Sequence, residues 1–195
     1  MKTAIQIGLT IVILVLVYLI YDSIMEPVRF NQEVARREAA IIQRLRDVRQ
    51  VQVAHRSVYQ RYNSDLDSLV SFVRKDSLPL IMAIGTVPDT LTEGEAVRAG
   101  LVRRDTIWIA ALDSLFRNKR YPVDSLPYVP FSKGKRFNLQ AGMIERGLVK
   151  LPVFEAYTMP EHYMSDLDDW RTYYTRVDGL KVGSMIEASI DGNWE

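Results

Sequence analysis

The sequence contains no cysteine and only two histidines. The lack of cysteine excludes a disulfide scaffold, a thiolate zinc site and a thiol nucleophile. The 25 lysine and arginine residues almost cancel the 24 aspartate and glutamate residues, which leaves a formal net charge of +1. This balance excludes a globally basic nucleic-acid binder and a disordered acidic tail.

The sequence motifs of common enzyme classes are also missing. There is no P-loop, no dinucleotide-binding glycine turn, no serine-hydrolase elbow and no H-E-x-x-H zinc helix. We therefore expect a protein that is not an enzyme and that needs no cofactor or metal.

The first feature that is present is an uncharged apolar run from Thr3 to Tyr21. As a helix, this run is about 28 Å long, close to the hydrocarbon thickness of a bilayer. A cleaved signal peptide is the rival interpretation, but the run is long for one, and residues 21–26 lack a small-x-small cleavage site. The pattern predicts a retained, single-pass membrane anchor over residues 1–26, whereas a buried core helix of a soluble protein is the less favoured alternative.

The charges that flank this run bear on its orientation. Lys2 directly precedes the run, and Asp22 and Glu26 come first on its other side. Arginines further along, beginning with Arg29, favour the opposite orientation by count alone. An anchor at the extreme N-terminus usually exports the remainder of the chain. We therefore expect the anchor to span the cytoplasmic (inner) membrane, with the N-terminus on the cytoplasmic side and the C-terminal domain in the periplasm.

Residues 27–62 are predicted to form a helical stalk. Pro27 is expected to interrupt or kink the helix just past the membrane, and no glycine or proline occurs from Phe30 to Tyr62. Apolar residues recur at heptad-like spacing and predict a helix-packing interface: Val34, Ile41, Leu45 and Val48. This seam fits partner helices in a coiled coil, the protein's own globular part, or a mixture of the two.

The stalk is rich in arginine. Residues 29–61 hold eight arginines and three carboxylates, for a net charge of +5. A solvated helix face is the simplest interpretation, and anionic lipid or an acidic partner are the alternatives. Nucleic acid is not expected, because no aromatic stacking platform accompanies the basic face.

Residues 63–195 are predicted to form a small globular α+β head. Asp65 or Asp67 is expected to cap a helix through Phe72 and Val73. Strands are predicted at residues 106–110, 137–144 and 148–157, and an amphipathic helix is predicted from Pro160 to Tyr174. Leu78-Pro79 is expected to be an irregular connection. We expect a small antiparallel sheet from about residue 78 onward.

Two groups of residues are candidates for chemistry. The acidic cluster of Asp166, Asp168 and Asp169 invites a calcium site, but it falls on a predicted helix without the glycine turn of a calcium loop. A solvated helix face is therefore the preferred interpretation. His55 lies on the stalk seam, where a structural role is more common than a catalytic one.

The order of parts resembles the type IV pilin and type II secretion pseudopilin superfamily. Pro27 falls where pilin helices often kink, and residues 46–62 resemble the Tyr-rich end of pseudopilin helices. Residues 63–69 resemble the lead-in to the pseudopilin head. The resemblance covers mainly residues 4–72 and implies an apolar helix, an amphipathic continuation and an α+β head. The whole chain is also similar to a group of single-pass envelope proteins from Bacteroidota.

We therefore expect a non-enzymatic, membrane-anchored subunit of an envelope-spanning secretion or pilus-like assembly. It would act in an oligomer or hetero-complex, through helix packing and through contacts of the head with other protein subunits. The alternatives are a membrane-tethered coiled-coil scaffold unrelated to pilins and a tethered ligand-binding or hydrolytic head.

Overall fold

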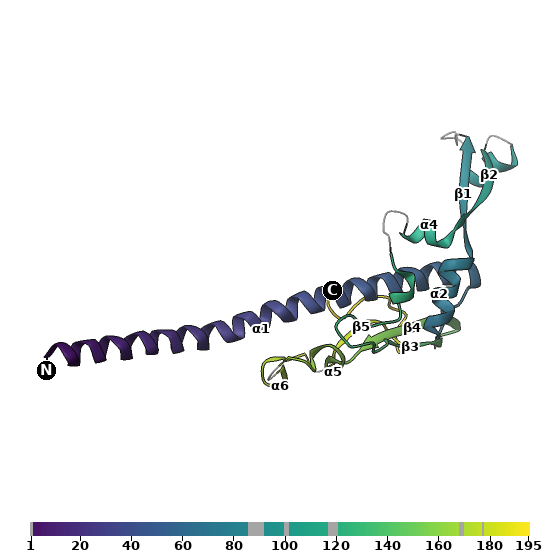
Figure 1. The fold of residues 1–195 in the computed structure, drawn as a ribbon. Coiled ribbons are helices and arrows are strands. Elements are labelled where there is room, and N and C mark those ends of the chain that lie inside the picture. Colours follow the sequence, from purple (N-terminus) through teal and green to yellow (C-terminus); the bar gives the residue numbers. More distant parts are fainter. Residues whose placement is uncertain (1, 86–91, 100–101, 117–120, 168–169, 177) are drawn as a thin grey trace.

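The computed structural model describes residues 2–85, 92–99, 102–116, 121–167, 170–176 and 178–195. The fold is α+β, as the sequence predicts: a long apolar N-terminal helix is followed by a small domain with antiparallel sheets. Figure 1 shows the helix as a rod whose N-terminal half extends well beyond the domain, which gathers around the other half.

The rod is helix α1, Lys2–Tyr59. It continues through Pro27, so the segments expected as an anchor (1–26) and a stalk (27–62) form one helix over most of their length. The interruption expected at Pro27 is therefore not seen, and a kink there stays a prediction. The helix ends where Gln60 adopts a positive φ of 58°.

Helix α2, Leu66–Lys75, follows directly and is capped as predicted. The Asp65 side chain accepts hydrogen bonds from the backbone N–H groups of Asp67 and Ser68, which have no partner within the helix. The face of α2 that carries Leu69, Phe72 and Val73 is buried. Together α1 and α2 form a helical hairpin at the end of the rod.

A two-stranded antiparallel sheet comes next. Strand β1, Ser77–Gly85, pairs with β2, Val102–Ala110. Short helices α3, Glu93–Arg98, and α4, Ala111–Phe116, precede and follow β2. The prediction of an irregular connection at Leu78-Pro79 was wrong, because both residues lie in β1. Proline is tolerated there since each strand of a two-stranded sheet has a free edge that needs no N–H donor.

The second sheet has the strand order β3-β4-β5 and is antiparallel throughout. The 3₁₀ helix η1, Val123–Ser125, leads toward it. Strands β3, Asn138–Arg146, and β4, Val149–Thr158, form the predicted hairpin, and β5, Leu180–Gly183, adds to the free side of β4. The sheet lies against α1, whose side chains share its core.

The segment between β4 and β5 differs from the prediction of one amphipathic helix. It forms α5, Pro160–Met164, and α6, Trp170–Tyr173, with turn and bend residues at 165–167. Pro160 occupies the first turn of α5, as expected. Helix α6 lies nearer than α5 to the apolar half of α1 (Figure 1).

One hydrophobic core joins α1, α2, α4, α5 and the three-stranded sheet. Its fully buried side chains include Ile41, Leu45, Val48, Val51, Leu69, Phe154, Tyr163, Leu180 and Val182. The second half of α1 is therefore itself a central element of the head.

Candidate membrane anchor and its junction with the head

The N-terminal half of α1 is the first candidate site. Among the described residues, α1 is the one helix long and apolar enough to cross a membrane. The large apolar side chains from Ile5 to Ile24 are all more than half exposed, because none of the other residues that the structure describes covers them. Burial in a bilayer would remove this surface from water at about 0.8 kcal/mol per CH₂ group.

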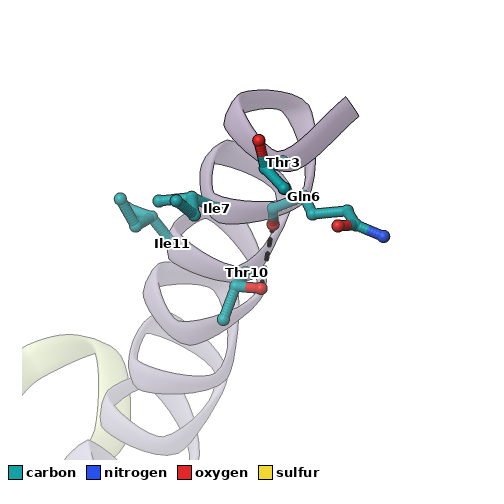
Figure 2. Close-up of a pocket in the computed structure, with 5 residues that line it drawn as sticks. All are labelled: Thr3, Gln6, Ile7, Thr10 and Ile11. Carbon is teal, nitrogen blue, oxygen red and sulfur yellow. Dashed lines mark hydrogen bonds between the residues drawn. The ribbon is translucent and has the colours of Figure 1, made fainter. Parts of the chain in front are cut away.

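Polar side chains follow one line along the start of this apolar segment. Thr3, Gln6 and Thr10 recur at spacings of three and four, and they line a shallow hollow together with Ile7 and Ile11 (Figure 2). The Thr10 hydroxyl donates a hydrogen bond of 2.9 Å to the Gln6 carbonyl, whereas the Gln6 amide points away from the helix (Figure 2). In hydrocarbon, such an amide favours a partner helix that offers a hydrogen bond.

The junction between α1 and the head is organised by Arg37, whose side chain is 7% exposed. Its guanidinium donates to both carboxylate oxygens of Asp166, at 2.5 and 2.9 Å, and to the Tyr163 carbonyl at 2.6 Å. Its Nε donates to Glu33 at 2.8 Å, and the guanidinium carbon lies 5.3 Å from the centre of the Phe131 ring. This buried arginine therefore ties α1 to the segment between α5 and α6.

The ionisation of this pair follows from its geometry. The hydrogen bonds from Arg37 hold the pKa of Asp166 down, at about 2, although burial opposes them. The same bonds raise the pKa of Arg37 above its usual value. Both groups are therefore charged at neutral pH, and the bidentate arrangement fixes their relative orientation.

A second chain of polar contacts crosses the junction from Glu38, the residue that follows Arg37 on α1. The Tyr174 hydroxyl donates to Glu38 at 2.6 Å and lies 2.8 Å from the hydroxyl of the fully buried Tyr163. Arg176 approaches Glu38 at 3.6 Å. Burial, reinforced by Glu38, raises the pKa of Tyr174, and burial raises the pKa of Tyr163 to about 12. Both phenols therefore stay protonated and act as fixed hydrogen-bond donors.

We call these six residues the junction cluster: Glu33, Arg37, Glu38, Tyr163, Asp166 and Tyr174. They hold residues 163–167 and 170–174 on α1 at the end of the head that faces the apolar segment. The groups pair with one another, and their contacts position α1 against Tyr163, Asp166 and Tyr174.

The predicted helix-packing interface lies inside the head and not on a surface that is open to a partner helix. Ile41, Leu45 and Val48 are 0% exposed within the protein's own core, and Val34 is partly buried against it. The structure thus realises the alternative in which the seam packs on the protein's own domain. These four side chains offer little surface to another chain unless the head moves away.

The polar residues of the seam also have structural partners. The Gln52 side chain donates to the Asn63 carbonyl at 2.7 Å and accepts from the Asn63 N–H at 3.0 Å. His55 Nδ1 lies 2.9 Å from the Arg61 carbonyl, and the centre of its ring lies 4.7 Å from that of the tilted Tyr59 ring and 5.1 Å from that of the edge-on Phe72 ring. Both residues fix the turn between α1 and α2, which fits the structural role expected for His55.

The acidic cluster does not assemble a cation site in the described part of the chain. Asp166 is paired with Arg37, and Asp168 and Asp169 lie outside the described residues. Among the residues that are described, no three histidine or carboxylate side chains are placed to share a metal ion.

A further candidate surface is the β1–β2 hairpin, which projects away from the remainder of the head (Figure 1). Leu80 pairs with Ile107 across one face, and both are nearly half exposed. Trp108, opposite Pro79 on the other face, is 62% exposed. A two-stranded ribbon is marginal alone in water, and exposed apolar groups of this size favour protein contact.

Comparison with protein-family models, with curated proteins and with solved structures found no match, so the geometry of the chain itself carries the functional argument.

Proposed function

We propose that the chain is a non-enzymatic, membrane-anchored subunit of an envelope-spanning secretion or pilus-like assembly. The apolar half of α1 spans the cytoplasmic membrane, with the N-terminus inside and the head in the periplasm. One observation carries this proposal: a single helix is bare and apolar over its first half and is a core element of the head over its second half. The resemblance in layout to pilins agrees with it.

Two surfaces are suited to contacts with other subunits. Within the membrane, the line of Thr3, Gln6 and Thr10 supports packing against a partner helix. In the periplasm, the exposed side chains of the β1–β2 hairpin support contact of the head with another subunit. A parallel coiled coil through the residue 34–48 seam is less favoured, because the head already covers that seam.

The assembly proposal is tested on the full chain, expressed at native level and extracted in a mild detergent. We expect it to migrate on a native gel as part of a complex larger than one chain with its micelle. Gln6→Leu should weaken the intramembrane contact by about 0.5–1.5 kcal/mol and shift material to the small species. Ile13→Leu, which keeps the span apolar, is the matched control. Migration of the wild-type chain as a single copy would refute the assembly role.

The orientation is tested separately by protease treatment of spheroplasts. The head should be digested from outside, and it should survive in whole cells whose outer membrane is intact. Protection of the head in spheroplasts would place it in the cytoplasm and overturn that part of the proposal.

A further inference from the structure

The head comes closest to the apolar half of α1 at helix α6. The ring centres of Phe30 on α1 and Tyr173 on α6 lie 5.5 Å apart, and Figure 1 shows α6 at the end of the head that faces the N-terminal half of the rod. The junction cluster holds this segment in place through Arg37 and Tyr174. The position of α6 along α1 is therefore fixed by buried contacts.

Counting along α1 places this corner near the edge of a bilayer. The apolar run ends at Tyr21, and Phe30 lies nine residues further, or about 13–14 Å at 1.5 Å per residue. The headgroup layer extends roughly 5–8 Å beyond the hydrocarbon. The remaining gap of about 5–9 Å is comparable to the length of an extended arginine side chain, and a usual helix tilt of about 20° toward α6 reduces it.

The side chains at this corner have the chemistry of a membrane interface. Arg171 is exposed, and its guanidinium carbon lies 5.3 Å from the Trp170 ring centre. Tyr173 is 39% exposed beside Phe30. Tryptophan and tyrosine are enriched at headgroup level, and arginine is well suited to phosphate oxygens. Arg171 is the single basic residue of 170–173, whereas binding of anionic lipid takes a cluster of about four to eight; the corner therefore fits zwitterionic rather than anionic headgroups.

We propose that the α6 corner, residues 170–173, rests on the zwitterionic phospholipid headgroups of the membrane that α1 spans. This inference depends on the proposed function for the anchor and deepens it. The head is then held to the membrane at two places, by α1 and by α6, so that the tilt of the head relative to the bilayer is set. The β1–β2 hairpin, at the far end of the head, then keeps one direction relative to the membrane plane.

The chain lacks cysteine, which makes single-site labelling straightforward. We would place an environment-sensitive fluorophore on Thr172→Cys and reconstitute the full chain in phosphatidylcholine vesicles that contain lipid spin-labelled at the headgroup. The exposed Ser71→Cys on α2, at the distal end of the head, is the matched control. Because Trp170 and Tyr173 favour headgroup level, we expect the neighbouring Thr172 label to lose at least about half of its fluorescence. The Ser71 label should lose little, since spin quenching needs close approach.

A third label separates this inference from the anchor itself. Val15→Cys, in the middle of the apolar run, should be quenched by lipid spin-labelled deep in its acyl chain. If Val15 is quenched and Thr172 is not, the α6 inference is wrong while the anchor stands. If Val15 is not quenched, both are wrong. A combined Arg171→Glu and Tyr173→Ser variant should reduce quenching at Thr172 and leave it unchanged at Val15.

Discussion

Arg37 and Asp166 form a bidentate ion pair across 129 residues of sequence. The arginine comes from the middle of the long helix, and the aspartate comes from the turn after α5. Because Arg37 is almost fully buried and Asp166 is partly exposed, the pair closes the edge of the core where the head ends and bare helix begins.

Asp166→Asn tests this closure. The substitution removes the charge that balances buried Arg37, although Glu33 and the Tyr163 carbonyl remain as its partners. We expect a loss of about 1–2 kcal/mol in the free energy of unfolding, measured by denaturant titration of the detergent-solubilised chain. Arg36→Ala, an exposed neighbour that also pairs with Glu33, should change stability by less than about 0.5 kcal/mol.

The same pair predicts a pH dependence. The pKa of Asp166 is about 2 in the folded chain and about 3.9 in an unfolded one. The stabilisation that ionised Asp166 gives the folded chain is therefore present above pH 3.9 and is lost as the pH falls toward 2. Unfolding monitored between pH 5 and pH 2 should become easier at low pH, and the Asp166→Asn curve should be flatter. Parallel curves would contradict the assignment.

Tyr174→Phe removes the hydroxyl that joins Tyr163 to Glu38. Among the described residues, Glu38, whose side chain is 19% exposed, would keep the longer contact to Arg176. We expect a loss of about 1–2 kcal/mol, with the largest rise in hydrogen exchange at residues 163–174. Tyr128→Phe, on a half-exposed ring, is the control and should be close to neutral. Equal effects of the two substitutions would show that the hydroxyl chain is unimportant.

Leu45 distinguishes a core role from a partner interface. If it contacts only another chain, Leu45→Ala weakens assembly and spares the head. Because Leu45 is fully buried in the protein's own core, we expect a loss of about 2–5 kcal/mol from the head itself, seen as a lower denaturation midpoint. Val53→Ala, on the exposed side of the same helix, should cost less than about 0.5 kcal/mol. If the Leu45→Ala head keeps its stability and the complex is lost, Leu45 contacts a partner chain and the core role is wrong.

Gly179 provides a backbone test at the start of β5. It has a φ of +66°, and an added Cβ would lie 2.1 Å from the Thr158 carbonyl oxygen. Gly147 has the same φ, but nothing lies within 4 Å of its added Cβ. Gly147→Ala should cost about 1–2 kcal/mol from backbone conformation alone. Gly179→Ala should cost clearly more, because β5 must also separate from β4. Thermal unfolding of the two variants compares these effects directly.

Local signals explain why α2 and the β3–β4 hairpin were predictable. Asp65 offers a side-chain cap just before a run of apolar residues at helical spacing. Strand-like segments flank the turn at Gly147. These preferences act over a few residues and are visible in the sequence. Strand β1 was missed since Pro79 argues against a strand, and only the pairing with β2 shows that it lies on a free edge.

The long-range contacts were not accessible in the same way. The periodicity of Ile41, Leu45 and Val48 shows that one face of the helix is buried, but it does not show by what. The role of Arg37 depends on Asp166 and Tyr163, and nothing in the chain between them points to the contact. An arginine beside an apolar seam, with Glu33 one turn before it, is the only sequence signal of this junction.

The order in which the chain leaves the ribosome has a consequence for the shared helix. The apolar half of α1 is made before the head and is available for membrane insertion at once. The core around Leu45 closes only when Leu180 and Val182 have been made. Until then the second half of α1 exposes its apolar face, and it is during this interval that a chaperone has most to protect.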